Sequence, residues 1–165
     1  IYKDSLILAY LIKDYENPKK INKQAKQRII AYDVCIGKRK SNDYSISREI
    51  DCSEKLSKQV ISLMNVSDFA LASTDPDCNS VIGRSCKNYN YMANFENSYW
   101  TLTADSSNTN KVYKISTTPT LSNAKSSAMP RMVINLSENT NVSGSGTEED
   151  PYIVSGFDSE LKELD

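Results

Sequence analysis

The chain has 165 residues, a formal net charge of −1 and no histidine, and its ten tyrosines outnumber its three phenylalanines. This length indicates one domain, and the balanced charge lacks the basic excess typical of proteins that bind nucleic acid. The absence of histidine removes the commonest general base and the commonest metal ligand. Tyrosine buries its ring while its hydroxyl stays near water, so a hydrophobic content of 39% predicts a thin core under a polar surface.

Two helices are predicted in the first 32 residues. The segment 3–16 (KDSLILAYLIKDYE) carries an apolar stripe at helical spacing and is followed by the breaker Asn17-Pro18. The segment 19–32 repeats that spacing. It carries five basic side chains between positions 19 and 28, which we interpret as a solvated helix face.

The beginning of the chain is apolar but short. The run at 6–12 is the longest apolar cluster, whereas a membrane span takes roughly 18 residues or more. The chain begins at Ile1 without a methionine. We therefore expect that a leader or membrane anchor preceded this residue and was removed.

Four cysteines, with no histidine and no C-x-x-C spacing, favour disulfides over a zinc site. Three pairings are open. We favour the sequential one, Cys35–Cys52 and Cys78–Cys86, because each bond would close a local loop. Two disulfides imply an oxidising, extracytoplasmic compartment. The alternative is four free thiols in a cytosolic protein.

Short elements are predicted through the middle of the chain. Residues 33–51 suggest a hairpin between the first two cysteines, and 53–64 suggest a helix capped by Ser53. Residues 65–75 suggest a strand end and then a short helix capped by Ser67. The Asp, Pro, Asn and Gly content of 75–88 predicts a loop tied by its own cysteines.

The second half of the chain is predicted to be β. Segments 98–104, 110–117 and 131–138 partly alternate apolar and polar residues, and the turn-rich segment 142–154 ends in one more strand. The sequence therefore predicts an α+β fold whose N-terminal helices pack on a mainly antiparallel sheet. We expect one extracellular domain over 1–154, with a helical part (1–32), a disulfide-stapled α+β part (33–154) and a flexible tail at 155–165.

An ordered series of motifs lies between residues 58 and 154. It consists of ISLMNVSDFALASTD, CKNYNYMA, SYWTLTADSSNTNKVYKIS, PRMVINLS and VSGSGTEEDPYIV. In this order the motifs resemble a family of uncharacterised surface-exposed domains from Firmicutes and related bacteria, whose members carry W-T-L-T, V-R-P-V-I-N-L-like and G-x-G-T-x-x-x-P-Y-x-I motifs. Here Pro130-Arg131-Met132 stands where the family has Arg-Pro, which shifts the backbone constraint by one residue.

The resemblance implies a module on a bacterial cell surface, often placed behind an N-terminal membrane-anchoring helix as in pilin-like proteins. It also implies a distant analogy to the C-type-lectin-like fold. A fold-level analogy of this kind leaves the function open.

The only tryptophan, Trp100, follows Tyr99 in a predicted strand. Alternation along a strand places these two side chains on opposite faces, so we expect Trp100 in the core and Tyr99 facing outward. The alternative is a carbohydrate site whose aromatic rings stack on a sugar while the polar run after the strand forms hydrogen bonds. Its candidate residues are Tyr91, Tyr99, Asp105 and Asn108.

Patterns with catalytic or metal-binding chemistry are weak. Ser122 and Lys125 fit S-x-x-K, but the accompanying K-T-G is missing. Carboxylates pair at Asp75/Asp77, at Asp43/Asp51 and within 148–150, and none stands in the apolar surroundings that a glycosidase acid requires. Asp75, Asp77 and Asn79 match only the start of a calcium-binding loop. We therefore expect no catalytic residue, no metal and no cofactor.

These patterns predict a non-enzymatic extracellular surface module of a Gram-positive-type bacterium, either a pilin-like subunit or an adhesin ectodomain. The expected partners are other copies of the chain, other surface subunits or glycans, with no nucleic acid and with the membrane reached only through the removed anchor. The alternative is a carbohydrate-binding, lectin-like domain. A secreted hydrolase is the third and least favoured hypothesis.

Overall fold

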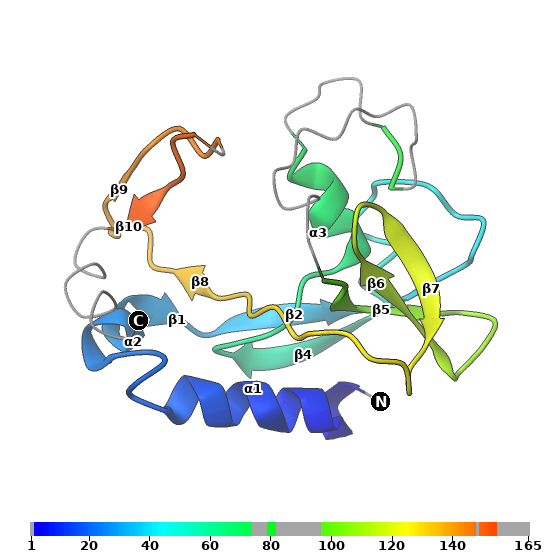
Figure 1. Ribbon diagram of the computed structural model, residues 1–165, viewed down its shortest axis with the longest axis horizontal. Helices are drawn as coiled ribbons and strands as arrows, with labels where there is room; N and C mark the ends of the chain where they lie inside the picture. Colours follow the sequence, from blue (N-terminus) through cyan, green and yellow to red (C-terminus); the bar gives the residue numbers. More distant parts are fainter. Residues whose placement is uncertain (1, 74–78, 82–96, 148, 155–165) are drawn as a thin grey trace.

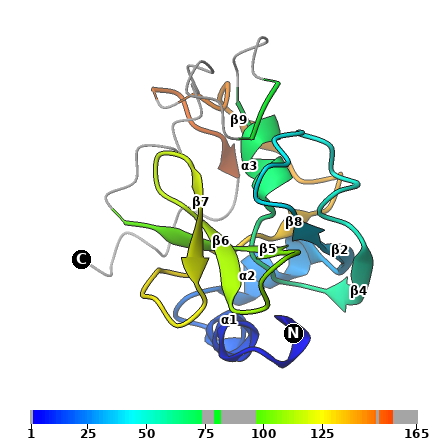
Figure 2. The same cartoon turned by 90° about the vertical axis from the view of Figure 1, so that its right-hand side faces the viewer.

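The computed structural model describes residues 2–73, 79–81, 97–147 and 149–154, and its fold is α+β, as predicted. Figure 1 shows α1 at the bottom and α3 at the top with strands between them, and Figure 2 shows the same order after a quarter turn. The helices in the described residues are η1 (Tyr2–Asp4), α1 (Leu6–Glu16), α2 (Lys23–Arg28) and α3 (Val66–Leu71).

The described strands form one sheet of four strands and three pairs. The larger sheet has the order β3-β5-β6-β7 and is mixed, because β3 runs parallel to β5 while the other neighbours are antiparallel. The pairs β1–β8, β2–β4 and β9–β10 are antiparallel. The bounds are β1 (Ile29–Ile30), β2 (Tyr32–Ile36), β3 (Lys38–Arg39), β4 (Glu54–Gln59), β5 (Tyr99–Asp105), β6 (Lys111–Ile115), β7 (Pro119–Asn123), β8 (Asn135–Leu136), β9 (Val142–Ser143) and β10 (Ile153–Val154).

Helix α1 confirms the first helix prediction over Leu6–Glu16. The Ser5 hydroxyl caps it by accepting a hydrogen bond from the Leu8 N–H at 3.2 Å. Its buried residues are Leu8, Leu11 and Asp14, and Leu11 has no exposed surface. Leu11 belongs to the main core cluster together with Ile61 and Trp100, so the helix is held by the β part of the chain.

The second predicted helix is wrong beyond Arg28. Helix α2 begins after Asn22, whose side chain accepts from the Ala25 N–H at 2.7 Å, and it covers only Lys23–Arg28. Ile29 and Ile30 then form β1 and pair with β8. Branching at Cβ restricts the side chains of these two residues and favours an extended backbone.

The helix predicted over 53–64 is also wrong, because strand β4 occupies Glu54–Gln59 and pairs with β2. The Ser53 hydroxyl caps no helix and donates to the Ile36 carbonyl at 3.3 Å. Lys58 has a positive φ of 55° at a register irregularity in this ladder. The hairpin predicted over 33–51 is wrong for the same reason: β2 pairs with β4, and β3 pairs with β5.

The short helix predicted after residue 65 is confirmed as α3, although its N-cap is Asn65 and not Ser67. The helix packs on the buried face of strand β6, to which Tyr113 and Ile115 both belong. Phe69 lies in a cluster with Ile115, and Val66 lies in a cluster with Tyr113. This packing fixes the N-terminal end of α3 next to β2 and β5.

In the second half, β5 and β6 confirm the first two predicted strands, and the β9–β10 hairpin confirms the strand that ends 142–154. The third predicted strand, 131–138, is reduced to the two residues of β8 and a bridge from Val133 to Ser62. Strand β7 lies in a segment where no strand was expected. The tail 155–165 and most of the predicted loop 75–88 lie outside the described residues.

Strand β5 is buried along most of its length, in contrast to the alternation that was expected. Trp100 is 6% exposed and packs in the main core cluster. On the opposite face, the Thr101 hydroxyl donates to the Tyr113 carbonyl at 2.8 Å, and the Thr103 hydroxyl accepts from the Val66 N–H at 3.0 Å. Both threonines are therefore hydrogen-bonded inside the protein, as buried polar groups must be.

Candidate ligand-binding groove

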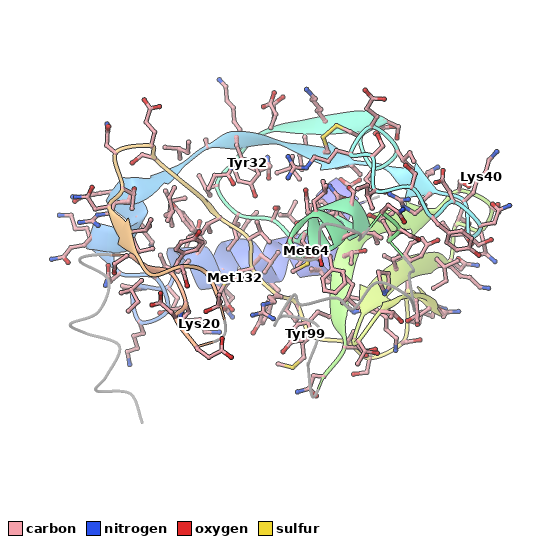
Figure 3. The ribbon with its side chains drawn as sticks, turned by 90° about the horizontal axis from the view of Figure 1, so that it is seen from above. Lys20, Tyr32, Lys40, Met64, Tyr99 and Met132 are labelled. Carbon is pink, nitrogen blue, oxygen red and sulfur yellow. A yellow bond between two sulfur atoms is a disulfide. The ribbon has the colours of Figure 1, made fainter. Side chains whose placement is uncertain are left out.

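A groove of about 410 Å³ opens between β2 and the N-terminal end of α3, and we call it the β2–α3 groove. It lies where the β1–β8 ladder divides. Ile30 still pairs with Asn135, but Val133 bonds Ser62 while β2 turns away to pair with β4. Figure 3 shows two of its lining residues, Tyr32 beside β2 and Met64 beside α3. Its apolar lining consists of Val34, Leu63, Met64, Leu102 and Val133.

Tyr32 lies at the end of the groove nearest to β1. Its hydroxyl is 2.6 Å from the Ser62 hydroxyl and donates to the Val133 carbonyl at 3.4 Å. Burial raises the pKa of the Tyr32 phenol, and the hydrogen bond between Tyr32 and Ser62 offsets part of that rise. The ring is therefore a neutral, fixed wall of the groove at physiological pH.

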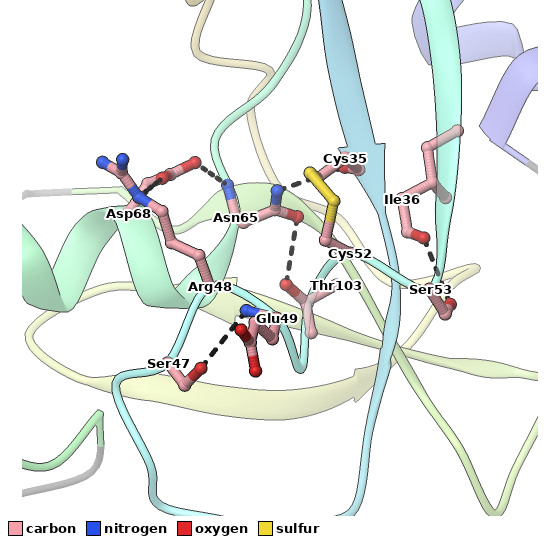
Figure 4. The surroundings of a disulfide bond; sticks show 10 residues. All are labelled: Cys35, Ile36, Ser47, Arg48, Glu49, Cys52, Ser53, Asn65, Asp68 and Thr103. Atoms are coloured by element: carbon pink, nitrogen blue, oxygen red, sulfur yellow. Dashed lines mark hydrogen bonds and ion pairs between the residues drawn. A yellow bond between two sulfur atoms is a disulfide. The ribbon is translucent and has the colours of Figure 1, made fainter.

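Asn65 joins α3 to strand β2 at the other end. Its side-chain amide donates to the Cys35 carbonyl at 3.1 Å, and its side-chain oxygen accepts from the Thr103 hydroxyl at 3.4 Å. Figure 4 shows these contacts beside the Cys35–Cys52 disulfide. Because Asn65 bonds both neighbours, this wall of the groove is held by side chains as well as by packing.

An ion pair between Arg48 and Asp68 stands on the solvent side of the groove. The Arg48 Nε lies 3.2 Å from Asp68 Oδ1, and the two side chains are 69% and 41% exposed. The second Asp68 oxygen accepts from the Asn65 N–H at 3.3 Å, which fixes the carboxylate at the first turn of α3. The terminal nitrogens of Arg48 have no hydrogen bond to any residue that the structure describes.

Ser67 lines the groove from the first turn of α3 and is 1% exposed. Its N–H donates to Asp51 Oδ2 at 2.9 Å. Its hydroxyl is buried and has no hydrogen-bond partner within the described part of the chain. A buried hydroxyl without a partner costs free energy, so Ser67 is an unfavourable polar contact at the first turn of α3.

A buried ion pair supports this end of the groove from behind. Arg39 and Asp51 are both fully buried, and their two nitrogen–oxygen contacts are 3.2 and 3.1 Å long. Arg39 also donates to the backbone carbonyls of Asp43 and Ser45. Gly37 makes the arrangement possible, because a methyl group there would collide with the Asp51 backbone.

The residues predicted for a carbohydrate site do not come together. Tyr99 and Asp105 stand at opposite ends of β5, six residues or about 20 Å apart. Asp105 is 6% exposed and accepts from the Ser107 N–H at 2.9 Å, while Asn108 accepts from the Asn110 N–H at 3.0 Å in the turn that follows. The guanidinium of Arg131 lies 5.4 Å from the centre of the Tyr99 ring. Tyr91 lies outside the described residues.

The first predicted disulfide is confirmed, with the Cα atoms of Cys35 and Cys52 4.5 Å apart. The second, Cys78–Cys86, falls outside the described residues. Residues 122–125 form the end of β7 and a turn. Ser122 and Lys125 therefore do not stand on a helix, where an i, i+3 spacing would bring their side chains together.

Arg39 pairs with both members of the Asp43/Asp51 set, at 3.6 Å from Asp43 Oδ1 and 3.1 Å from Asp51 Oδ2. Asp51 also accepts from the Ser67 N–H, and Asp43 accepts from the Ser45 N–H at 3.1 Å. Asp150 caps the β9–β10 turn by accepting from the Ser145 N–H at 2.8 Å. The possible calcium ligands Asp75 and Asp77 lie outside the described residues. Across the residues that are described, no group of three or more acidic or cysteine side chains is arranged to hold a metal ion.

The sequence did not predict a ligand site at any of the residues that line the groove. Tyr32, Arg48, Ser67 and Asn135 come from four separate segments. The one local signal was the Asn65–Asp68 spacing, which matches a helix cap. Comparison with protein-family models, with curated proteins and with solved structures found no match. Among the described helices, none is long and apolar enough to cross a membrane.

Proposed function

We propose that this chain is a non-enzymatic, extracytoplasmic module of a surface protein from a Gram-positive-type bacterium. The observation that carries the proposal is the Cys35–Cys52 disulfide, because such bonds persist in oxidising compartments. The disulfide lies beside the groove, because the Cys35 carbonyl accepts a hydrogen bond from the Asn65 side chain. The resemblance of the ordered motifs to bacterial surface domains supports the same location.

Of the two forms of this proposal, an adhesin ectodomain has more support than a pilin-like subunit. The β2–α3 groove opens to solvent beside the exposed Arg48. A concave site with an apolar floor and a few polar groups is the usual form of a small-ligand site. A carbohydrate-binding, lectin-like role is the second candidate, and the mixture of polar groups in the groove favours it over a hydrolase.

The test uses intact cells of the source bacterium. An antibody raised against the chain should label them without permeabilisation, and digestion of the recovered protein without reductant should release a peptide pair linked through Cys35 and Cys52. A labelled cytoplasm together with free thiols at both positions would reject the proposal. A pilin-like subunit would instead be recovered as a polymer of this chain.

A further inference from the structure

We propose that the outer face of helix α1 and the basic turn after it bind the surface of an anionic lipid bilayer. The outer α1 face consists of the exposed residues Leu6, Ala9, Tyr10, Ile12 and Lys13. The basic turn is the segment 17–23, which leads into α2 and carries Lys19, Lys20 and Lys23. This inference goes beyond the proposed function, because it assigns a partner to one face of the chain and an orientation to the whole molecule.

Helix α1 is apolar on its solvent side as well as on its core side. The core side holds Leu8 and Leu11, which are buried. On the outer α1 face Leu6 is 90% exposed, Tyr10 48% and Ile12 40%, and Leu6 and Tyr10 stand one turn apart. A helix that is apolar all round is normally covered on every side, so this exposed face indicates an interaction surface.

The basic turn folds back along the same side of the helix. The Lys20 ammonium lies 5.6 Å from the centre of the Tyr10 ring and 2.8 Å from Asp14 Oδ2. Because Tyr10 belongs to the outer α1 face, this contact places the turn beside the exposed apolar side chains. Figures 1 and 2 show α1 at the lower edge of the molecule, where both features can meet one flat surface.

Positive charge is in excess around this face. Lys13, Lys19 and Lys23 are exposed, and none of them forms an ion pair with a residue that the structure describes. Residues 1–28 hold seven basic and three acidic side chains, whereas the whole chain holds 20 and 21. The rest of the chain is therefore acidic, and an anionic surface attracts this end of the molecule while it repels the remainder.

A bilayer fits this combination better than a second copy of the chain or an acidic protein. A symmetric pair of outer α1 faces would bring two positively charged surfaces together. A convex helix needs a matching groove in a protein partner, whereas the fluid headgroup layer adapts to it. Apolar side chains that enter the interface, beside lysines that attract anionic headgroups, are typical of helices that lie on membranes, and tyrosine is enriched at that depth.

The experiment is sedimentation of the purified, disulfide-intact chain with lipid vesicles. One set of vesicles contains phosphatidylglycerol and phosphatidylcholine in equal amounts, and the other contains phosphatidylcholine alone. We expect binding at low ionic strength to be tighter for the anionic vesicles by about tenfold or more, and to weaken as salt is added. Leu6→Trp should add a fluorescence emission that shifts to the blue on anionic vesicles, because the new ring then leaves water.

One pair of variants tests the apolar contribution. Leu6→Ser should weaken binding to the anionic vesicles by about tenfold, because it removes an apolar side chain from the interface. The control is Tyr152→Ser, which removes an apolar side chain that is 63% exposed next to β10. This control should leave the affinity unchanged. Both positions are exposed, so the circular dichroism of both variants should match that of the wild-type chain.

A second pair tests the charge. Lys19→Gln/Lys23→Gln should weaken binding by about tenfold or more, since each lysine near an anionic surface contributes about fivefold. Lys38→Gln/Lys40→Gln removes the same charge from two other exposed positions and should change the affinity by about twofold or less. Figure 3 shows Lys40 at the opposite end of the molecule from Lys20.

Several results would overturn the inference. They are a failure to sediment with anionic vesicles at low salt, equal binding to both kinds of vesicle, or equal losses in a variant and its control. Soluble poly-L-glutamate that binds as tightly as the vesicles would assign the face to an acidic protein instead. A dimer in analytical ultracentrifugation that Leu6→Ser dissociates would assign it to a second copy. The labelling of intact cells tests the proposed surface location separately, so either proposal can fail without the other.

Discussion

The Trp100 side chain is a major component of the main hydrophobic core. It is 6% exposed and joins residues of α1, β2 and β5 in the main cluster. Replacement of such a residue by alanine typically costs about 3–5 kcal/mol, so we expect Trp100→Ala to lower the free energy of unfolding by this amount in urea denaturation. Native fluorescence should be blue-shifted and poorly quenched by iodide. Tyr99→Ala, at a half-buried position, is the matched control and should cost about 1 kcal/mol. Equal losses in the two variants would contradict this assignment.

Arg39 is the second residue on which the fold depends. Removing one partner of a buried ion pair leaves an uncompensated charge and typically costs about 3–5 kcal/mol. We expect Arg39→Met to show a loss of this size in the free energy of unfolding, because Asp51 then remains fully buried without its cation. The double variant Arg39→Met/Asp51→Leu should recover much of the loss. A double variant no more stable than the single one would show that the backbone bonds of Arg39, and not its charge, stabilise this region.

At the scale of elements, the disulfide joins strand β2 to Cys52, two residues before β4. Cys35 and Cys52 are 17 positions apart, and the chain-entropy relation assigns about 3 kcal/mol to a loop of this size. The paired change Cys35→Ser/Cys52→Ser should lower the free energy of unfolding by about this amount. Wild-type protein treated with reductant should unfold at the same urea concentration as the variant. Unchanged stability in both would mean that the β2–β4 ladder needs no covalent tie.

Elements whose signals are local could be predicted, and those defined by distant partners could not. Ser5 and the apolar stripe of α1 are contiguous, and the helix was found. The segment that forms β4 follows a serine suited to capping a helix and contains good helix formers, but pairing with β2 overrides that preference. Ile29 and Ile30 pair with residues more than one hundred positions away, which no local pattern reveals. The groove was missed for the same reason, since its walls come from separate segments.

The whole molecule should lose stability in alkali through its buried tyrosines. Burial raises the pKa of Tyr2 to about 12 and also raises the pKa values of Tyr32 and Tyr113. A raised pKa means that the folded state holds the phenol proton more tightly than the unfolded chain. The stabilisation is therefore complete below the unfolded value of 10.0 and is lost as pH rises toward the folded values. Urea denaturation at increasing pH should show this decline between pH 10 and about 12, and Tyr2→Phe should make it shallower. A constant free energy of unfolding across that range would contradict the burial of these rings.

The parallel contact between β3 and β5 has a consequence for the order in which the protein matures. Lys38 pairs with Ala104, so β3 can join the sheet only when β5, a strand much later in the sequence, is in place. The two cysteines of the first disulfide are 17 positions apart and flank Arg39, whereas Lys38 and Ala104 are 66 positions apart (104 − 38). We therefore expect Cys35 and Cys52 to join early, while Arg39 is still in water. The docking of β5 then removes that side chain from solvent as a late and slow step, since contacts between distant residues form slowly.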